Sequence, residues 1–437
     1  MGQASWEICH SANQPCGILA FMLAKPNQPD WDVIVVGGGP AGFFAAIRCA
    51  ELNPGLRVLI LEKASQTLGK VLISGGGRCN VTHACFEPAQ LIGYYPRGGA
   101  ALRGAFTRFQ PADTVRWFEE RGVKLKTEAD NRIFPVTDSS KTIADCLREA
   151  ARKTGVQVRL GANLQRVEKI QGGFDLEVLS AAQSQRLQAP KLLIATGSDS
   201  ITREIVQTLG HSIETPVPSL FTFKIADARL EGLAGLSVES VTVKMGGLTQ
   251  RGPLLVTHWG LSGPAILRLS AWGARALFEK KYHATLTVNW LGDMTLDQAF
   301  DVLHKHKFWH ENVRKKAVTK SPFSQLPARL WKQLAQEIVQ EKSWGAVSNA
   351  ELRKLAEALT TGTFEITDKG QFKEEFVTCG GVRLAEVDFK TMQSRIVDGL
   401  FFVGEVLDID GITGGFNFQS SWTTGWLAGS AMGAGYK

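Results

Sequence analysis

The first clear hydrophobic pattern in the chain predicts a strand, a glycine turn, a helix and a second strand. Residues 32–36 form a short, mostly β-branched run, and the glycine-rich residues 37–42 follow it. Small and apolar residues at 43–52 predict a helix, and the apolar run 57–61 predicts a buried strand that ends at Glu62. This order is typical of a βαβ unit.

The same kind of pattern continues to about residue 200. Amphipathic helices are predicted at 112–121 and 142–154, and residues 191–195 form another short apolar run. We interpret this part of the chain as the first, α/β domain.

Beyond Pro216 the pattern changes to alternating apolar and polar positions, which predicts a β-rich insertion. Its clearest strands are expected at 220–225, 238–245 and 283–289. The pattern becomes helical between Thr295 and Thr360.

After Glu374, strand and glycine patterns return and lead to a closing helix at 420–432. We interpret this last part as the return of the chain to the first domain, where it joins the first sheet a second time.

Composition narrows the class of protein only slightly. The chain has 49 Lys and Arg against 42 Asp and Glu, and its net charge of +7 permits an anionic partner without requiring one. The seven cysteines form neither a metal-ligand pattern nor a disulfide framework, so we predict no metal site and a reducing cytoplasm.

We also expect no membrane partner, because no run approaches the roughly 18 apolar residues that a membrane helix needs. Residues 1–29 show no periodicity, and Met22 lies just ahead of the first strand. We hypothesise that translation starts at Met22 rather than at Met1, without a signal peptide.

The turn at 37–42 has the spacing of a dinucleotide fingerprint. In such a turn, the first glycine (Gly37) permits a tight bend, the second (Gly39) lets a pyrophosphate approach, and the third (Gly42) lets helix and strand pack closely. Glu62 follows Gly42 at the distance expected of a carboxylate that accepts the ribose hydroxyls. NAD and FAD share this fingerprint, so it leaves the choice between them open.

Two further glycine-rich segments favour a large planar ligand such as a flavin. One is Gly69–Asn80, and the other is Gly411–Asn417, which follows Glu405, Asp408 and Asp410 and precedes a helix. Backbone amides at that helix start are suited to the edge of a flavin ring. The alternative for the first segment is a glycine-rich surface loop, and the alternative for the second is an ordinary helix start.

These segments, together with Thr257–Ala265, resemble the signatures of the BaiN/RdsA-like flavoprotein family. The resemblance extends over nearly the whole chain from residue 31, and it is greatest for the cyanobacterial and plant-plastid branch. It implies an α/β fold with a Rossmann-like FAD-binding domain, an inserted β-barrel-like domain and a small helical domain. The resemblance also implies reduction of a carbon–carbon double bond, either in steroid-like bile-acid intermediates or at a uridine of large-subunit ribosomal RNA.

The family's organisation places the FAD-binding domain at 31–202 and 376–437, the β-rich domain at 203–294 and 358–375, and the helical domain at 295–357. Residues 1–30 are then a disordered extension. The predicted cofactor-binding residues are Gly37, Gly38, Gly39, Ala41, Gly42, Glu62, Lys63, Lys70, Arg78, Asn80, Ala195, Gly197, Gly404, Glu405, Asp410, Gly414, Gly415, Phe416 and Asn417.

Two residues are candidates for the catalytic acid that such a reduction requires. His258 lies in a motif that the family shares, and histidine titrates near neutral pH. Cys379 lies between residues that permit close approach, including Gly380 and Gly381. The alternative for His258 is a structural histidine that ties the insertion domain together. The resemblance argues against Cys379, because relatives do not commonly carry cysteine at this position.

Three functions remain open from the sequence. The first is an FAD-dependent, NAD(P)H-driven reductase, possibly of ribosomal RNA, and the second is a reductase or dehydrogenase of a steroid-like or quinone-like small molecule. The third is a flavin-bearing RNA-binding factor without catalysis. The segment 295–360 holds 11 Lys or Arg against seven Asp or Glu, with a cluster at Lys305, Lys307, Arg314, Lys315, Lys316 and Lys320, and this cluster is either an RNA contact or a solvated face.

Overall fold

The buried apolar residues divide the protein into two lobes. The computed structural model describes residues 29–308, 311–370 and 377–434. The hypothesis about Met22, and residues 1–28 of the extension predicted at 1–30, therefore lie outside the described residues. One core is built almost entirely from residues before 221 and after 376, and the other lies within 221–366. We call residues 29–219 with 377–434 the first lobe, and residues 220–370 the second lobe. The predicted domain bounds stay predictions.

The first lobe is organised around a mostly parallel sheet. Its strand order is β20-β21-β22-β10-β1-β2-β6, and the five strands from β22 to β6 are parallel. Parallel strands are covered on both faces, which explains their continuous apolar runs. The strands are β1 (Val33–Val36), β2 (Val58–Leu61), β6 (Gln157–Arg159), β10 (Lys191–Ile194), β20 (Val387–Asp388), β21 (Gln393–Ser394) and β22 (Leu400–Phe402).

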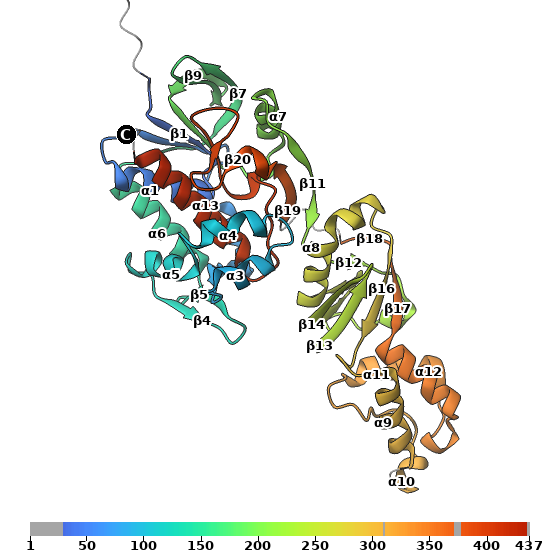
Figure 1. Ribbon diagram of the computed structural model, residues 1–437. Helices are drawn as coiled ribbons and strands as arrows, with labels where there is room; N and C mark the ends of the chain where they lie inside the picture. Colours follow the sequence, from blue (N-terminus) through green and yellow to red (C-terminus); the bar gives the residue numbers. More distant parts are fainter. Residues whose placement is uncertain (1–28, 309–310, 371–376, 435–437) are drawn as a thin grey trace, which may run out of the picture.

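The two ends of the described chain meet in this lobe, where helices α1 (Pro40–Leu52) and α13 (Phe416–Gly433) pack side by side (Figure 1). Gly425, Gly429 and Gly433 form a stripe on α13. A Cβ on any of them would collide with backbone atoms of α1, so the glycine stripe allows this close helix contact.

The remaining elements of the first lobe surround the parallel sheet. Two small antiparallel sheets have the orders β3-β5-β4 and β7-β8-β9, and the second of these was not predicted. The elements are α2 (Gly69–Gly77), β3 (Thr82–His83), α3 (Pro88–Leu91), the 3-10 helix η1 (Ile92–Tyr94), α4 (Gly99–Phe106), α5 (Pro111–Glu119), β4 (Leu125–Thr127), β5 (Arg132–Pro135), α6 (Ser140–Lys153), β7 (Ala162–Ile170), β8 (Gly173–Ser180), β9 (Gln183–Ala189) and α7 (Ser200–Thr208).

The second lobe contains a closed β-barrel. Its antiparallel sheet has the order β17-β16-β13-β14-β15-β12-β18, and only Thr367 separates its first strand from its last along the chain. Because this one segment pairs with β16 and then with β12, the sheet closes on itself. The strands are β12 (Phe223–Lys224), β13 (Ser237–Met245), β14 (Leu248–Thr257), β15 (Gly260–Ser262), β16 (Ala284–Asn289), β17 (Gly362–Ile366) and β18 (Asp368–Lys369).

The helices of the second lobe lie at opposite ends of the barrel (Figure 1). Helix α8 (Pro264–Glu279) faces the first lobe, and the helical group at the far end consists of α9 (Leu296–Phe308), α10 (Glu311–Arg314), α11 (Ala328–Val339) and α12 (Asn349–Thr360). In the described parts of the chain, no helix is both long enough and apolar enough to cross a membrane.

A two-stranded antiparallel ribbon connects the lobes. It consists of β11 (Ile213–Ser219), which leads into the barrel, and β19 (Val377–Val382), which returns from it. The predicted combination of a Rossmann-like domain, an inserted barrel and a helical group is therefore confirmed. One difference concerns the closing helix, which begins at Phe416 instead of residue 420 because Gly415, with φ of 92°, caps it.

Candidate functional site

The fingerprint turn has the geometry of a nucleotide-binding turn. The amides of Gly38 and Ala64 donate to the two oxygens of Glu62, each at 2.8 Å. A Cβ at Gly42 would overlap with the carbonyl oxygen of Gly37, so the third glycine is required for packing. A Cβ at Gly39 would meet no protein atom within 4 Å, so the second glycine borders open space at the start of α1.

The end of the neighbouring strand β10 adds a polar group to this turn. Ala195 lies against Gly37, and Gly197 adopts a left-handed backbone with φ of 65°. Between them, the hydroxyl of Thr196 is buried and has no hydrogen-bond partner among the described residues. Thr196 lies between the predicted cofactor residues Ala195 and Gly197, but no motif marked it as a cofactor residue itself.

The segment 69–80 is half helix and half glycine bend. Helix α2 begins at Gly69, and at Ser74, Gly75 and Gly76 the backbone leaves helical geometry. A Cβ at Gly76 or Gly77 would meet no protein atom within 4 Å. The bend therefore exposes backbone without side chains to open space. Backbone of this kind can lie against a planar ligand, as the sequence predicts.

The predicted lysines around this segment are paired with carboxylates. The ammonium of Lys70 contacts Glu405, and that of Lys63 contacts Asp199. Asp199 also accepts from the amide of Thr202 at 3.0 Å and so caps α7. Both lysines are exposed enough to exchange a carboxylate for a phosphate, since their side chains are 49% and 59% accessible.

Arg78 and Cys79 have surroundings that favour structural roles. The guanidinium of Arg78 donates to Glu128 at 2.7 Å and lies over the ring of Phe134. The thiol of Cys79 is fully buried, and burial raises its pKa to about 12. A cofactor contact by Arg78 therefore finds no support in this geometry.

The C-terminal glycine segment forms a tight loop at the start of α13. The Asn417 side chain accepts from the amide of Gly411 and donates to its carbonyl, both at 2.8 Å. The Asn80 carboxamide lies between the Thr82 carbonyl and the Gly415 amide, 3.0 and 2.9 Å from them in its favoured orientation. Asn80 and Asn417 thus shape the loop, and Gly414 and Gly415 form its bend.

These segments fit an FAD molecule. Gly38, Gly39 and Glu62 would hold the adenosine and pyrophosphate part, and Thr196 supplies a buried hydroxyl that lacks a partner beside them. Residues 75–77 and the bend at Gly414 would hold the flavin part. The predicted residues Ala41 and Gly404 lie in contact between α1 and the end of β22, where a Cβ at Gly404 would come within 2.9 Å of the Ala41 Cβ.

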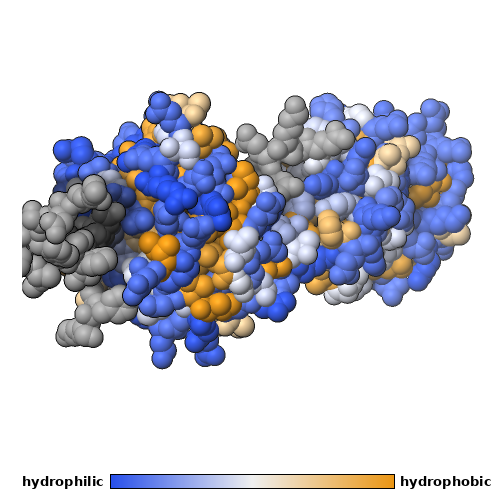
Figure 2. Space-filling model, turned by 90° about the horizontal axis from the view of Figure 1, so that it is seen from above, coloured by the Kyte–Doolittle hydropathy of each residue, from blue (hydrophilic) through white to orange (hydrophobic). Residues whose placement is uncertain are grey.

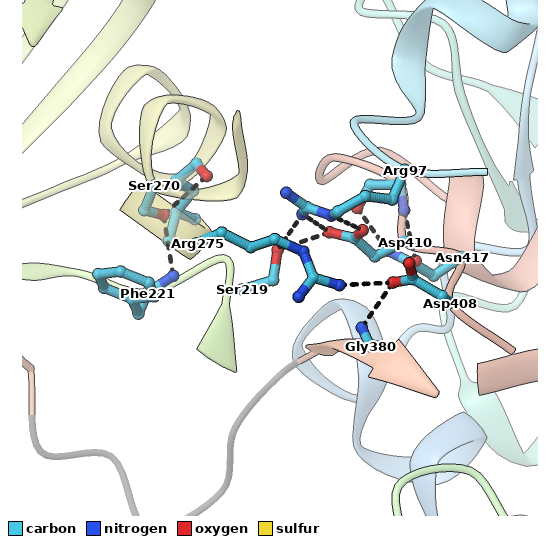
Figure 3. Close-up of polar contacts among 11 residues, drawn as sticks. Arg97, Ser219, Phe221, Ser270, Arg275, Gly380, Asp408, Asp410 and Asn417 are labelled. Atoms are coloured by element: carbon cyan, nitrogen blue, oxygen red, sulfur yellow. Dashed lines mark hydrogen bonds and ion pairs between the residues drawn. The ribbon is translucent and has the colours of Figure 1, made fainter. Parts of the chain in front are cut away.

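Asp410, a predicted cofactor residue, has a different partner. Its carboxylate is fully buried, contacts the Arg97 guanidinium through both oxygens and accepts from the Ser219 hydroxyl at 2.7 Å (Figure 3). Burial raises the pKa of Asp410 above its ordinary value, against the opposing effect of Arg97. Arg97 and Ser219 occupy both oxygens, so this geometry disfavours a cofactor contact by the Asp410 carboxylate and favours an ion pair at the junction of the lobes.

Asp408, two residues earlier, ties the same loop to the second lobe. It accepts from Arg275 of α8 at 3.0 Å and from the amide of Gly380 in β19 at 2.9 Å. Figure 3 shows both carboxylates on one side of this junction, with Arg275 reaching Asp408 from α8. The loop that precedes Gly414 is therefore attached to both connecting strands and to α8.

Cys379 lies at the junction of the lobes, where neighbouring side chains bury it. Its side chain has no exposed surface and packs against Val217 and Ala274. Burial raises the pKa of the thiol to about 11. This geometry disfavours a direct contact between Cys379 and a substrate.

His258 lies in the turn between β14 and β15, where it is exposed. The turn directly precedes Gly260, which pairs with Lys224, whereas the chain crosses between lobes at Ser219 and Val377. No contact of the described residues joins His258 to a predicted cofactor residue. The structure thus does not bring the two predicted catalytic residues together.

An aromatic cluster that the sequence did not indicate lies beside Gly414. Phe416 stacks on Tyr94 with ring centroids 4.4 Å apart, and on His83 at 4.7 Å. Burial lowers the pKa of His83, and its Nδ1 atom has no partner among the described residues. Tyr94 belongs to η1 and His83 to β3, so only the fold brings these rings together.

Comparisons with known proteins agree with this geometry. The model of the family described as HI0933-like protein Rossmann domain matches residues 31–431. The chain is 29% identical over 408 residues to ribosomal RNA dihydrouridine synthase of Escherichia coli (strain K12), which covers 91% of this chain and 96% of the relative. It is 27% identical over 419 residues to 3-dehydro-bile acid delta(4,6)-reductase of Clostridium scindens, covering 91% of this chain and 98% of the relative.

Among solved structures, the fold is similar to 3-ketosteroid-delta4-(5alpha)-dehydrogenase from Rhodococcus jostii RHA1 in complex with 4-androstene-3,17-dione. The TM-score is 0.52 at 16% identity, and the match covers 93% of this chain and 98% of the other. The family and the fold are those of FAD-dependent oxidoreductases, so the expectation of an enzyme of this class is confirmed.

Proposed function

Because the chain belongs to the HI0933-like Rossmann family of FAD-dependent oxidoreductases, we propose that it reduces a carbon–carbon double bond with electrons from NAD(P)H. Our preferred substrate is a uridine of large-subunit ribosomal RNA, which would become dihydrouridine. The observation that carries the proposal is the cofactor cradle, which segments 37–42, 69–80 and 411–417 assemble from both ends of the chain beside the junction of the lobes.

The relatives support one class of substrate. Uridine and a 3-dehydro-bile acid with a 4,6-diene share a C=C bond conjugated to a carbonyl group, and such a bond accepts a hydride. When bound, FAD supplies that hydride to one carbon, and the protein must supply a proton to the other. The sequence holds no second complete glycine fingerprint, so NAD(P)H would have to approach the flavin directly.

The helical group of the second lobe supports RNA over a small molecule. Arg314, Lys315, Lys316 and Lys320 are exposed at its tip, and the Arg314 guanidinium lies over the exposed ring of Phe308. Basic groups that alternate with an exposed aromatic ring suit an RNA backbone and its bases. Lys307 does not contribute, because it is buried and donates to the carbonyl of Val347. The face of the second lobe that Figure 2 shows is mostly hydrophilic.

Nucleoside mass spectrometry tests the proposed substrate. We expect dihydrouridine to disappear from large-subunit ribosomal RNA when the gene is deleted and to return with the intact gene. The absorbance spectrum of the purified protein, recorded in parallel, should show bound flavin. Unchanged RNA nucleosides with flavin present would rule out this substrate and favour a steroid-like or quinone-like ketone, the alternative that the Clostridium relative supports.

The basic tip can be tested separately from catalysis, because both an RNA reductase and a flavin-bearing RNA-binding factor would bind RNA there. Reversing Arg314, Lys315 and Lys316 to glutamate should weaken RNA binding and flatten its dependence on salt, because fewer counterions are released. Reversal of Lys153, Arg166 and Arg186, which are exposed in the first lobe, is the matched control. If the two triple variants bind RNA with equal affinity, the tip is not part of the RNA-binding surface.

A further inference from the structure

Helix α8 contacts the first lobe through one charged side chain and several small apolar ones. Arg275 donates to Asp408 at 3.0 Å and to the Thr215 carbonyl of β11 at 3.4 Å. Among the described residues, its pair with Asp408 is the only ion pair that joins the two lobes. Ala274 packs against the ribbon of β11 and β19, and Ala271 packs against the first lobe's core. Because apolar contacts are non-directional, Arg275 provides the contact that fixes how α8 lies on the first lobe.

Within the second lobe, α8 is attached to the barrel. Ser270 accepts from the amide of Phe221, just beyond the end of β11, at 3.0 Å (Figure 3). Leu269 and Leu277 are buried in the second lobe's core. A shift of the barrel relative to the first lobe therefore carries α8 and Arg275 with it.

On the other side of the junction, Asp408 begins the segment that leads to the bend at Gly414. We call residues 408–415 the flavin loop. Asp408 is fixed to the ribbon as well as to α8, because it also accepts from the Gly380 amide at 2.9 Å. Three further contacts hold the flavin loop in place beyond Asp408, and they join Asp410 to Arg97, Gly411 to Asn417, and the Ile412 amide to the Tyr94 carbonyl. A displacement of Asp408 is therefore passed along the loop to Gly414.

The junction balances two carboxylates with two guanidinium groups, one from each lobe. Burial and the nearby Asp408 charge both raise the pKa of Asp410, so the two carboxylates repel each other. Arg97 pairs with Asp410, and the second lobe supplies Arg275 for Asp408. If α8 moves away, Asp408 loses its cation while it still lies near Asp410, and the repulsion favours displacement of the flavin loop.

We propose that Arg275 is a positioning residue through which the second lobe holds the flavin loop in shape, so that docking of α8 and binding of FAD reinforce each other. Arg275 acts through Asp408 and the backbone of the loop. Because coupling between two equilibria is reciprocal, bound FAD must also fasten α8 to the first lobe. The inference goes beyond the proposed function, since it holds for any substrate.

The test uses the full-length protein, from which FAD is removed and to which it is then added back. The variant is Arg275→Gln. Lys280→Gln is the matched control, because it removes an exposed charge from the C-terminal end of the same helix. Two quantities are measured: the dissociation constant of FAD, from the quenching of its fluorescence, and the hydrogen exchange of backbone amides in α8, β11 and β19 with and without FAD.

We expect Arg275→Gln to bind FAD about 10-fold more weakly than the wild type, as a typical coupling between two sites predicts. In the wild type, FAD should slow hydrogen exchange in α8 and in the ribbon. In Arg275→Gln, FAD should slow exchange at the start of α1 but no longer in α8. Lys280→Gln should match the wild type in both measurements, and Arg275→Lys, which keeps the charge, should recover part of the FAD affinity.

A double-mutant cycle shows whether Arg275 acts through Asp408. Asp408→Asn alone should weaken FAD binding, because it removes the charge that Arg275 pairs with. Combined with Arg275→Gln, it should weaken binding no further than the larger of the two single effects. Additive losses would show that Arg275 acts by another route and would overturn its assignment as a positioning residue.

Two other outcomes would overturn the coupling. One is an FAD affinity of Arg275→Gln within about twofold of the wild type, well below a typical coupling. The other is unchanged protection of α8 by FAD in this variant. The proposed function would stand in either case, because neither measurement involves a substrate, whereas a wild-type protein that binds no FAD would overturn both proposals.

Discussion

Replacing Arg97 by leucine is expected to destabilise the protein by about 3–5 kcal/mol, because the substitution leaves the Asp410 carboxylate buried without its partner. The Arg97 side chain is only 14% exposed and that of Asp410 is not exposed at all, so water cannot replace the lost contacts. Urea unfolding followed by tryptophan fluorescence would measure the loss. The control is Arg116→Leu, which breaks an exposed pair with Asp113 and should cost no more than about 1 kcal/mol.

The defect of Arg97→Leu should also depend on pH in a definite direction. Burial already raises the pKa of Asp410, and loss of the guanidinium raises it further. A carboxyl group whose folded pKa lies above its unfolded pKa stabilises the folded state at low pH, and this stabilisation is lost as the pH rises through the folded pKa. The variant should therefore be closest to wild type at about pH 4, near the ordinary carboxyl pKa of 3.8, and weakest at about pH 7. A defect of the same size at both values would show that Asp410 does not carry the charge we assign to it.

The second large effect is expected at the fingerprint turn, where Gly42→Val should abolish FAD binding. A side chain at this position would overlap with the Gly37 carbonyl and press on Val35 and the Ala195 side chain. The turn would have to open, and the amides at the start of α1 would lose their orientation toward a pyrophosphate. Flavin absorbance per mole of purified protein measures the loss directly.

Gly55→Ala is the matched control, because Gly55 lies in the next turn and the nearest atom to a Cβ there is the Asn53 side-chain oxygen at 3.5 Å. It should retain flavin at the wild-type ratio. Full flavin content in Gly42→Val would disprove the cofactor site at this turn.

The sequence predicts well those parts of the fold whose signals are local. The unit from β1 to β2 follows from two apolar runs and one glycine turn, all within about thirty residues. By contrast, β9 (Gln183–Ala189) was missed, because its first four residues are exposed and carry no apolar alternation. It is stabilised by pairing with β8, which a pattern of single residues does not reveal.

The candidate site shows the same limit. The glycines and Glu62 were predicted from spacing, whereas Arg97 and Asp410 are 313 residues apart in the chain and meet only in the folded protein. The motif suggested that Asp410 faces a cofactor, since acidic residues precede a glycine loop. Tyr94 and His83 gave no signal at all, because each comes from a different segment and only the fold stacks both rings on Phe416.

The stripe of glycines on α13 has a consequence for biosynthesis. Helix α1 is completed by residue 52, yet its partner surface is formed by Gly425, Gly429 and Gly433, near the other end of the chain. Strand β22 and the loop at Gly414 are also made late, so a nascent chain lacks half of the cradle until these residues have been synthesised. The apolar face of α1 must stay protected during that interval, either by provisional contacts or by a chaperone. The second lobe, whose core lies within residues 221–366, has all its partners earlier and is free to fold while the first lobe is still incomplete.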